Sequence, residues 1–300
     1  MKHQKNEPSK KMIPQDFKAK ILAGFKEFGI VFGVFLILNS FVIASFEVPT
    51  GSMENEIMTG DFLLVNKFVF GGTTPQTIPF TNVKLPAFKF PAPWKVERGD
   101  VIVFIFPGYR EETEANPFAY YLKRCMALSG DTLQVINRVV YVNGSRVPLP
   151  KNMKFNTSYI KPAGLADQRI FPVGAAFNED NYGPIVIPKQ GDVINLNTDN
   201  FLKWNTFIKR EGHAVEFQRG RIYVDKKETS TYSVERDYVF GMGDNRDNSL
   251  DSRFWGFIPV KSVVGTPLIV YWSWDPDLPI IDLGNKFATI RWGRLGTLVH

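Results

Sequence analysis

The chain of 300 residues contains a single cysteine, Cys125, and only three histidines. A lone cysteine excludes an intramolecular disulfide bond. No cysteine or histidine spacing is typical of a zinc site, and the sequence His-Glu-x-x-His does not occur. A Ser-His-Asp triad would depend on His213, because the other two histidines lie near the chain ends. The sequence therefore predicts no metal and no cofactor, and it favours a catalytic base other than histidine.

Excess positive charge is confined to one segment. Residues 1–27 hold seven lysines against three acidic residues, so only +2 of the net charge of +6 belongs to the rest of the chain. Nucleic-acid-binding proteins concentrate Lys and Arg on the folded domain. We therefore expect no nucleic-acid partner. A mean hydropathy of −0.13 excludes a protein with several membrane spans but allows one.

One long uncharged run follows the lysines. Residues 28–46 (FGIVFGVFLILNSFVIASF) contain no charged side chain, and as a helix they would be about 28 Å long, close to the ~30 Å hydrocarbon core of a bilayer. A buried core helix and a cleavable signal peptide are the alternatives. The run is longer than the apolar region of most signal peptides. We expect an uncleaved transmembrane anchor, with the basic tail 1–27 in the cytoplasm and the rest outside.

Short β-rich runs follow the anchor, with turn residues between them. Alternating or β-branched residues predict strands, and Asn143-Gly144 and Gly220 predict hairpin turns. We expect no helix after the anchor, and a loop over roughly 148–190. The predicted strands and hairpins cover residues 61–68, 100–106, 120–128, 140–147, 215–225 and 262–272.

Two residues stand out as candidate catalytic groups. Ser52 lies in the turn-rich segment Pro49-Thr50-Gly51-Ser52, where a serine is most often only a turn residue. Lys123 lies in the predicted strand 120–128, on the same face as Tyr121 and Cys125. A lysine there either reaches solvent or is buried and loses its proton, and a neutral amine is a competent general base.

A third segment, residues 243–259 (GDNRDNSLDSRFWGFIP), is dense in Asp, Asn and Ser, whose side chains stabilise turns. It is either a rigid loop or part of a site. Together with 46–68, 98–107 and 121–131, in this order, it resembles the bacterial type I signal peptidases, which are membrane-anchored serine–lysine proteases. The pattern GDNRDNSxDSRxWGx[VI]P is matched at every fixed position, so this part of the resemblance is highly specific.

The resemblance implies roles for individual residues. Ser52 would be the nucleophile and Lys123 its general base, with Ser249 hydrogen-bonded to the lysine amine. The N–H of Ser52 and the hydroxyl of Thr50 would form the oxyanion hole. Asp251 and Arg253 would pair to hold the site. Shallow pockets for small residues at positions −1 and −3 of a signal peptide would be lined by Phe46, Val48, Leu63, Val103, Tyr121 and Leu122.

The segment after Ser52 departs from the family, because Asn55-Glu56 stands where Pro-Thr is usual, after Glu54. Carboxylates near Lys123 would hold it protonated and weaken it as a base, if they reach it. The departure leaves open an alternative function, a catalytically silent, membrane-anchored binding or scaffold protein.

These observations predict a mostly β protein, in which an antiparallel peptidase core carries an inserted β-rich cap and follows one transmembrane helix. The core would comprise residues 47–131 and 240–300, and the cap residues 132–239. We expect a monomeric serine endopeptidase of the bacterial inner membrane that removes signal peptides from exported preproteins on the outer, periplasmic face. Its partners would be those preproteins and the lipid bilayer.

Overall fold

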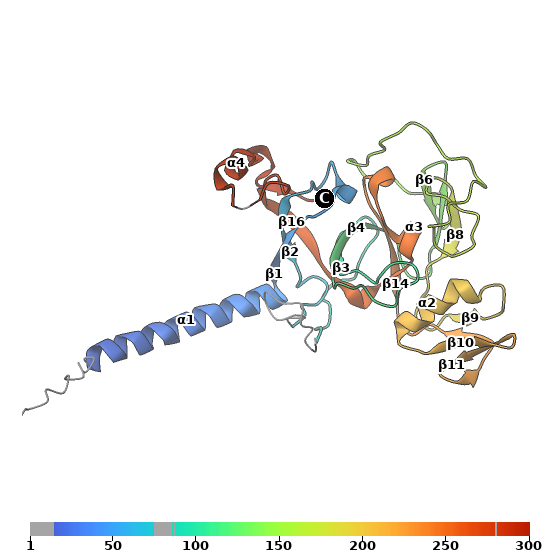
Figure 1. Cartoon of the computed structure of the whole chain (residues 1–300), viewed down its shortest axis with the longest axis horizontal. Helices are drawn as coiled ribbons and strands as arrows, with labels where there is room; N and C mark the ends of the chain where they lie inside the picture. The colour runs from blue at the N-terminus through green and yellow to red at the C-terminus, as the bar shows by residue number, and fades with distance from the viewer. Residues whose placement is uncertain (1–14, 75–85, 87, 280) are drawn as a thin grey trace, which may run out of the picture.

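The computed structural model describes residues 15–300 apart from 75–85, 87 and 280. A long N-terminal helix projects from a β-rich body (Figure 1). Helix α1 runs from Gln15 to Phe41, and the chain then enters strand β1, Ile43–Glu47. Half of the predicted basic tail, residues 1–14, lies outside the described part of the chain.

The predicted helix 28–46 therefore ends five residues too late. Residues 43–47 pair with strand β2 along their whole length, and Ala44 is buried, so sheet pairing replaces the helix there. No helix within the described residues combines the length and the hydropathy that a membrane crossing requires. The predicted transmembrane anchor is thus not confirmed and stays a prediction.

An eight-stranded, wholly antiparallel sheet forms the centre of the body. Its order is β1-β2-β16-β3-β4-β14-β15, with β17 paired to β16. Strands far apart in the sequence therefore lie side by side, as β16 does between β2 and β3 (Figure 1). The remaining bounds are β2 Asp61–Asn66, β3 Val101–Ile105, β4 Tyr120–Ala127, β14 Tyr238–Met242, β15 Ile258–Pro259, β16 Val263–Ser273 and β17 Thr297–Leu298.

The segment between β4 and β14 forms smaller antiparallel sheets on one side of the body (Figure 1). Both predicted hairpins are confirmed, and residues with positive φ form their turns at Asn143-Gly144 and at Arg219-Gly220. The predicted boundary between the inserted cap and the core, between residues 239 and 240, falls inside β14. The strands are β5 Thr132–Ile136, β6 Val139–Val142, β7 Ser145–Arg146, β8 Tyr182–Val186, β9 Val193–Asn195, β10 Val215–Gln218, β11 Arg221–Val224, β12 Lys227–Glu228 and β13 Thr231–Ser233.

Two expectations for the chain after the predicted anchor are wrong: that it contains no helix, and that residues 148–190 form a loop. An eleven-residue helix, α2 (Phe201–Glu211), buries Phe207 and Ile208 on one side and ends at Gly212, whose φ is +107°. Two short helices, α3 (Ser252–Trp255) and α4 (Leu283–Ala288), follow it in the chain. The expected loop 148–190 contains β8, which pairs with β5. Short elements whose apolar residues are few are stabilised by tertiary packing rather than by a strong local pattern.

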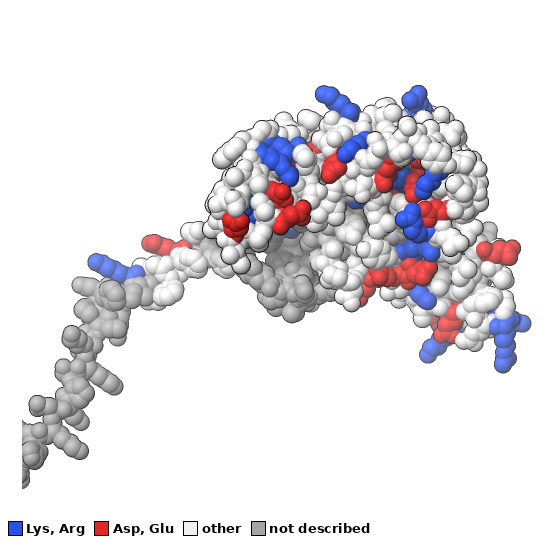
Figure 2. Space-filling model, turned by 45° about the horizontal axis from the view of Figure 1, so that its top comes forward, with Lys and Arg blue, Asp and Glu red and all other residues white. Residues whose placement is uncertain are grey.

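The core of the central sheet continues into the inserted segment. Phe240 on β14 is fully buried and its ring lies 5.6 Å from that of Tyr182 on β8. Leu133 on β5 and Ile222 on β11 belong to the same buried cluster as Phe104 on β3. The mostly β, antiparallel class is confirmed. Charges of both signs are interspersed over the face of the body seen in Figure 2.

Replacing Phe240 by Ala is expected to lower the free energy of unfolding by about 3–5 kcal/mol, because it leaves a cavity where the two parts of the core meet. Urea unfolding of the full-length chain in detergent, followed by far-UV circular dichroism, measures the loss. One cooperative transition is expected for both proteins. A wild type that unfolds in two separate steps would show that the inserted segment has an independent core.

Candidate active site

Ser52 lies in a single 3-10 turn, η1 (Gly51–Met53), between β1 and β2. The neighbouring Met53 is fully buried in an apolar cluster, and this packing holds the turn against the sheet. The carbonyl of Ser52 accepts a hydrogen bond from the N–H of Asn245, at 3.0 Å. A Cβ at Gly243 would collide with that same carbonyl and with Ser249 Oγ, so only glycine allows this close approach.

Lys123 on β4 meets Ser52 inside the body. Only 3% of Lys123 and 8% of Ser52 are exposed. Lys123 Nζ donates to Ser52 Oγ at 2.7 Å and to the carbonyl of Leu122 at 2.9 Å. Burial lowers the pKa of Lys123 to about 8, with opposing influences from Asp251 and Arg253. The amine is therefore about half neutral near pH 8, well below the pH at which an exposed lysine loses its proton.

The pair Asp251–Arg253 lies behind the site and is almost wholly buried, at 0% and 2% exposure. Two charge-assisted hydrogen bonds of 2.8 and 2.9 Å join the side chains, and Asp251 also accepts from the N–H of Gly243. Burial alone would raise the pKa of Asp251, but the guanidinium of Arg253 keeps it below its usual value. The pair thereby fixes the loop that follows β14.

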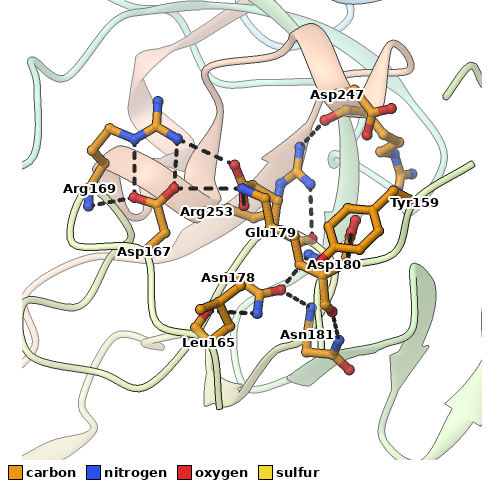
Figure 3. A network of polar contacts seen from close by, with 12 residues as sticks. Tyr159, Leu165, Asp167, Arg169, Asn178, Glu179, Asp180, Asn181, Asp247 and Arg253 are labelled. Atoms are coloured by element: carbon orange, nitrogen blue, oxygen red, sulfur yellow. Dashed lines mark hydrogen bonds and ion pairs between the residues drawn. The ribbon is translucent and has the colours of Figure 1, made fainter. Parts of the chain in front are cut away.

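Arg253 also connects this loop to the inserted segment. Its Nη1 donates to the carbonyl of Glu179 at 3.1 Å, and Glu179 in turn pairs with Lys161 and Arg169. Figure 3 shows Arg169, Glu179 and Arg253 close together, with Asp167 accepting three hydrogen bonds from Arg169. The resulting network places charged side chains of the inserted segment at the rim of the site.

The resemblance assigns two further residues to the site, and of these Ser249 does not form its predicted bond. Ser249 Oγ is buried and has no hydrogen-bond partner among the described residues, so the predicted bond to Lys123 is not made in this structure. The amine donates to Ser52 and Leu122 instead. Thr50 is exposed, and its hydroxyl does not cap η1.

A cavity of about 460 Å³ opens beside Ser52 and Lys123. Its lining includes Thr50, Ser249 and all of the residues predicted to contact substrate: Phe46, Val48, Leu63, Val103, Tyr121 and Leu122. The sequence analysis missed part of the lining, and only Asp247, Asn248, Leu250 and Phe254 lie in a recognisable motif. The lining residues that were missed are Glu47, Pro49, Met53, Tyr120, Arg169, Glu179, Asp247, Asn248, Leu250 and Phe254.

The carboxylates after Ser52 have other partners than Lys123. Glu54 accepts from Lys154 at 3.2 Å and from Asn245 at 3.1 Å. Glu56 accepts from Asn152 and from the N–H of His300. Burial, Asp251, Arg253 and Asp244 together account for the lowered pKa of Lys123, and neither glutamate forms an ion pair with it among the described residues.

No group of three or more His, Cys, Asp or Glu side chains within the described residues is arranged to hold a metal ion. The site thus consists of a buried serine–lysine pair beside a largely apolar cavity. Such a pair can supply a nucleophilic hydroxyl and a base for it.

Proteins of known family are similar in sequence to this chain over most of its length. The family described as signal peptidase, peptidase S26, matches residues 21–272. A signal peptidase I of Buchnera aphidicola subsp. Schizaphis graminum is 31% identical over 91% of this chain and 79% of its own length. Signal peptidase I of Pseudomonas aeruginosa is 28% identical, covering 94% and 83% of the two chains, and that of Aquifex aeolicus is 28% identical, covering 85% and 86%. The chain belongs to the signal peptidase family, peptidase S26, and is a peptidase of that family.

The burial of Lys123 predicts a pH-dependent stability. Its folded pKa, about 8, lies below the unfolded value near 10.4, so the unfolded chain binds more protons between these pH values. Stability of the wild type is therefore expected to rise from pH 8 to pH 10.5, by up to about 3 kcal/mol relative to Lys123→Met. Urea unfolding of both proteins at pH 7 and pH 10 measures this difference.

Lys67 and Lys89 also have a pKa lowered to about 8 by burial. Both are present in the wild type and in Lys123→Met, so their contributions cancel in the comparison. A difference between the two proteins that stays constant with pH would contradict a depressed pKa at Lys123.

Proposed function

We propose that this protein is a serine endopeptidase that removes signal peptides from exported preproteins through a Ser52–Lys123 dyad. One observation carries the proposal: Lys123 Nζ lies 2.7 Å from Ser52 Oγ, and both are buried beside the cavity. Serine is a weak nucleophile unless a base accepts its proton, and the described residues that line this cavity include no histidine. A lysine whose pKa is about 8 can be that base.

In the proposed reaction, neutral Lys123 takes the proton of Ser52 as Oγ bonds to the carbonyl carbon of the scissile peptide. The N–H of Ser52 and the hydroxyl of Thr50 stabilise the oxyanion that forms. The C–N bond then breaks, and Lys123 returns the proton to the leaving amine of the mature protein. Water, deprotonated by Lys123, hydrolyses the acyl-enzyme and releases the signal peptide with a free carboxylate.

The cavity supports small residues at positions −1 and −3. Its predicted contact residues are apolar or aromatic, and the Tyr120 ring, 5.0 Å from that of Phe46, narrows one side. Pockets of this kind favour small side chains, because a larger one would need to displace packed rings. The proposed substrates therefore end their signal peptides in a small-x-small sequence.

We further propose that residues 28–41 of α1 anchor the protein in the bacterial cytoplasmic membrane, with the N-terminus inside and Ser52 on the periplasmic face. The absence of charge in these residues and the lysines before them support this orientation. Ser52 follows α1 by eleven residues, so the dyad would lie close to the bilayer. A tethered preprotein and a tethered enzyme share one surface, which raises their effective concentration.

The alternative function, a catalytically silent binding or scaffold protein, rested on the possibility that Glu54 and Glu56 reach Lys123. Glu54 and Glu56 pair with other groups than Lys123, so they do not weaken it as a base. A binding protein would also have no need to bury a lysine amine against a serine hydroxyl.

Cleavage of a preprotein in detergent–lipid micelles tests the dyad. Ser52→Ala and Lys123→Ala are each expected to lower kcat/KM at least ~1000-fold, because the nucleophile and its base act as a unit. The wild-type rate is expected to rise with pH through about 8 and then level off, because only the neutral amine accepts the proton. A folded wild type that cleaves none of several preproteins, or a Ser52→Ala variant that retains activity, would refute the proposal.

The anchor is tested by alkaline carbonate extraction of cell membranes. Wild type is expected to stay in the pellet, while the double variant Val31→Lys and Phe35→Lys moves to the supernatant, because each lysine at the helix centre costs about 2.5–3.5 kcal/mol of insertion. The matched control, Val31→Leu and Phe35→Leu, is expected to behave as wild type. Release of the wild type by carbonate would contradict a transmembrane anchor.

A further inference from the structure

Strand β1 presents a free edge at the active site. It is the terminal strand in the order of the central sheet, and its last residues border the cavity beside Ser52. Val42 and Val48 turn their backbone groups toward β2 and the residues that flank it. The carbonyl of Val42 accepts from Lys67 N–H, the N–H of Val48 donates to the carbonyl of Asp61, and the carbonyl of Val48 accepts from Gly60 N–H. Because these groups alternate in direction along a strand, those of Glu47 point to the free edge. An extended peptide can pair there as an added strand.

The side chains of β1 also alternate. Phe46 is partly buried and Val48 is buried, whereas Glu47, between them, is exposed. All three residues border the cavity, and alternation along the strand turns the Glu47 side chain away from the side chains of its two neighbours. The residue paired with Glu47 on β2 is Phe62, which carries no charge. Within the described residues, the Glu47 carboxylate has no hydrogen bond and no ion pair.

The other charged side chains that line the cavity are already paired. Lys123 is bonded to Ser52, and Arg169 and Glu179 belong to the network drawn in Figure 3. Asp247 accepts from the N–H groups of Asn156 and Thr157. Of the described residues around this cavity, Glu47 is therefore the one charged group left for a substrate.

We propose that Glu47 selects preproteins that carry a basic residue, Lys or Arg, at position −2 of the cleavage site and disfavours Asp or Glu there. The inference rests on the proposed function. If residues −1 and −3 enter the cavity beside Phe46 and Val48, residue −2 lies opposite Glu47 and points to the same face as its carboxylate. Residues directly opposite on neighbouring strands have Cβ atoms about 4.5–5.5 Å apart, within reach of an ion pair.

The test uses three preproteins that differ only at position −2, which is Lys, Gln or Glu. Full-length enzyme in micelles of uncharged detergent and zwitterionic lipid avoids attraction between the substrate and an anionic surface. The measured quantity is the ratio of kcat/KM for the Lys substrate to that for the Glu substrate. We expect a ratio of about 3 to 10 for the wild type, in the range of exposed cross-strand charge pairs, and a smaller ratio at 0.5 M salt.

Three variants assign the preference to its residue. Glu47→Gln is expected to bring the ratio close to 1, and Glu47→Lys is expected to reverse it. Glu97→Gln removes the same charge from an exposed glutamate that does not line the cavity, and it is expected to keep the wild-type ratio.

The Gln substrate separates this inference from the proposed function. If wild type cleaves it and Ser52→Ala does not, but the wild-type ratio is 1, the role of Glu47 is refuted while the peptidase proposal stands. A Lys-to-Glu ratio of kcat/KM that is equally high in wild type and Glu47→Gln also refutes the role of Glu47, because another group then selects the residue at position −2. If wild type does not cleave the Gln substrate, the proposed function fails and this inference fails with it.

Discussion

The removal of the Lys123 amine from water is the constraint on which this site depends. A lysine exposed to solvent stays protonated well above neutral pH and cannot take a proton from serine. Here Lys123 lies on β4 between β3 and β14 and is only 3% exposed, and its amine donates to the hydroxyl of Ser52 and the carbonyl of Leu122. The rest of the body can be understood as the structure needed to hold a serine against that buried amine.

A second buried charge pair makes that arrangement rigid. Asp251 and Arg253 are desolvated together, and such a pair stabilises a structure only when its remaining hydrogen-bonding groups are satisfied. Asp251 bonds to the N–H of Gly243, and Arg253 bonds to the carbonyls of Arg246 and Glu179. The loop that packs against Ser52 is thereby linked to the inserted segment, which also contributes Arg169 and Glu179 to the rim of the cavity.

Sequence patterns predicted strands β2, β3, β4 and β16 of the central sheet and both hairpins, since alternation and turn residues act over a few neighbouring positions. They did not predict β14, β15 or β17. They failed where the decisive contact is distant. Helix α2 was missed because its buried side is completed by packing, and the start of β1 was taken for helix because its apolar residues fit either structure. From sequence, Glu54 and Glu56 could have kept Lys123 protonated. Only the structure shows that they bond to other groups instead.

By itself, the sequence determined the family and the two candidate catalytic groups, the Ser52 hydroxyl and the Lys123 amine. The long motif at 243–259 and the segments around these two residues can be recognised without a structure. The tertiary structure decided whether Lys123 is buried, that Ser249 leaves its hydroxyl unpaired, and which charges around the cavity are already neutralised. Burial and pairing depend on residues up to about two hundred positions apart, such as Ser52 and Gly243. No local pattern contains that information, because chain topology alone brings such residues together.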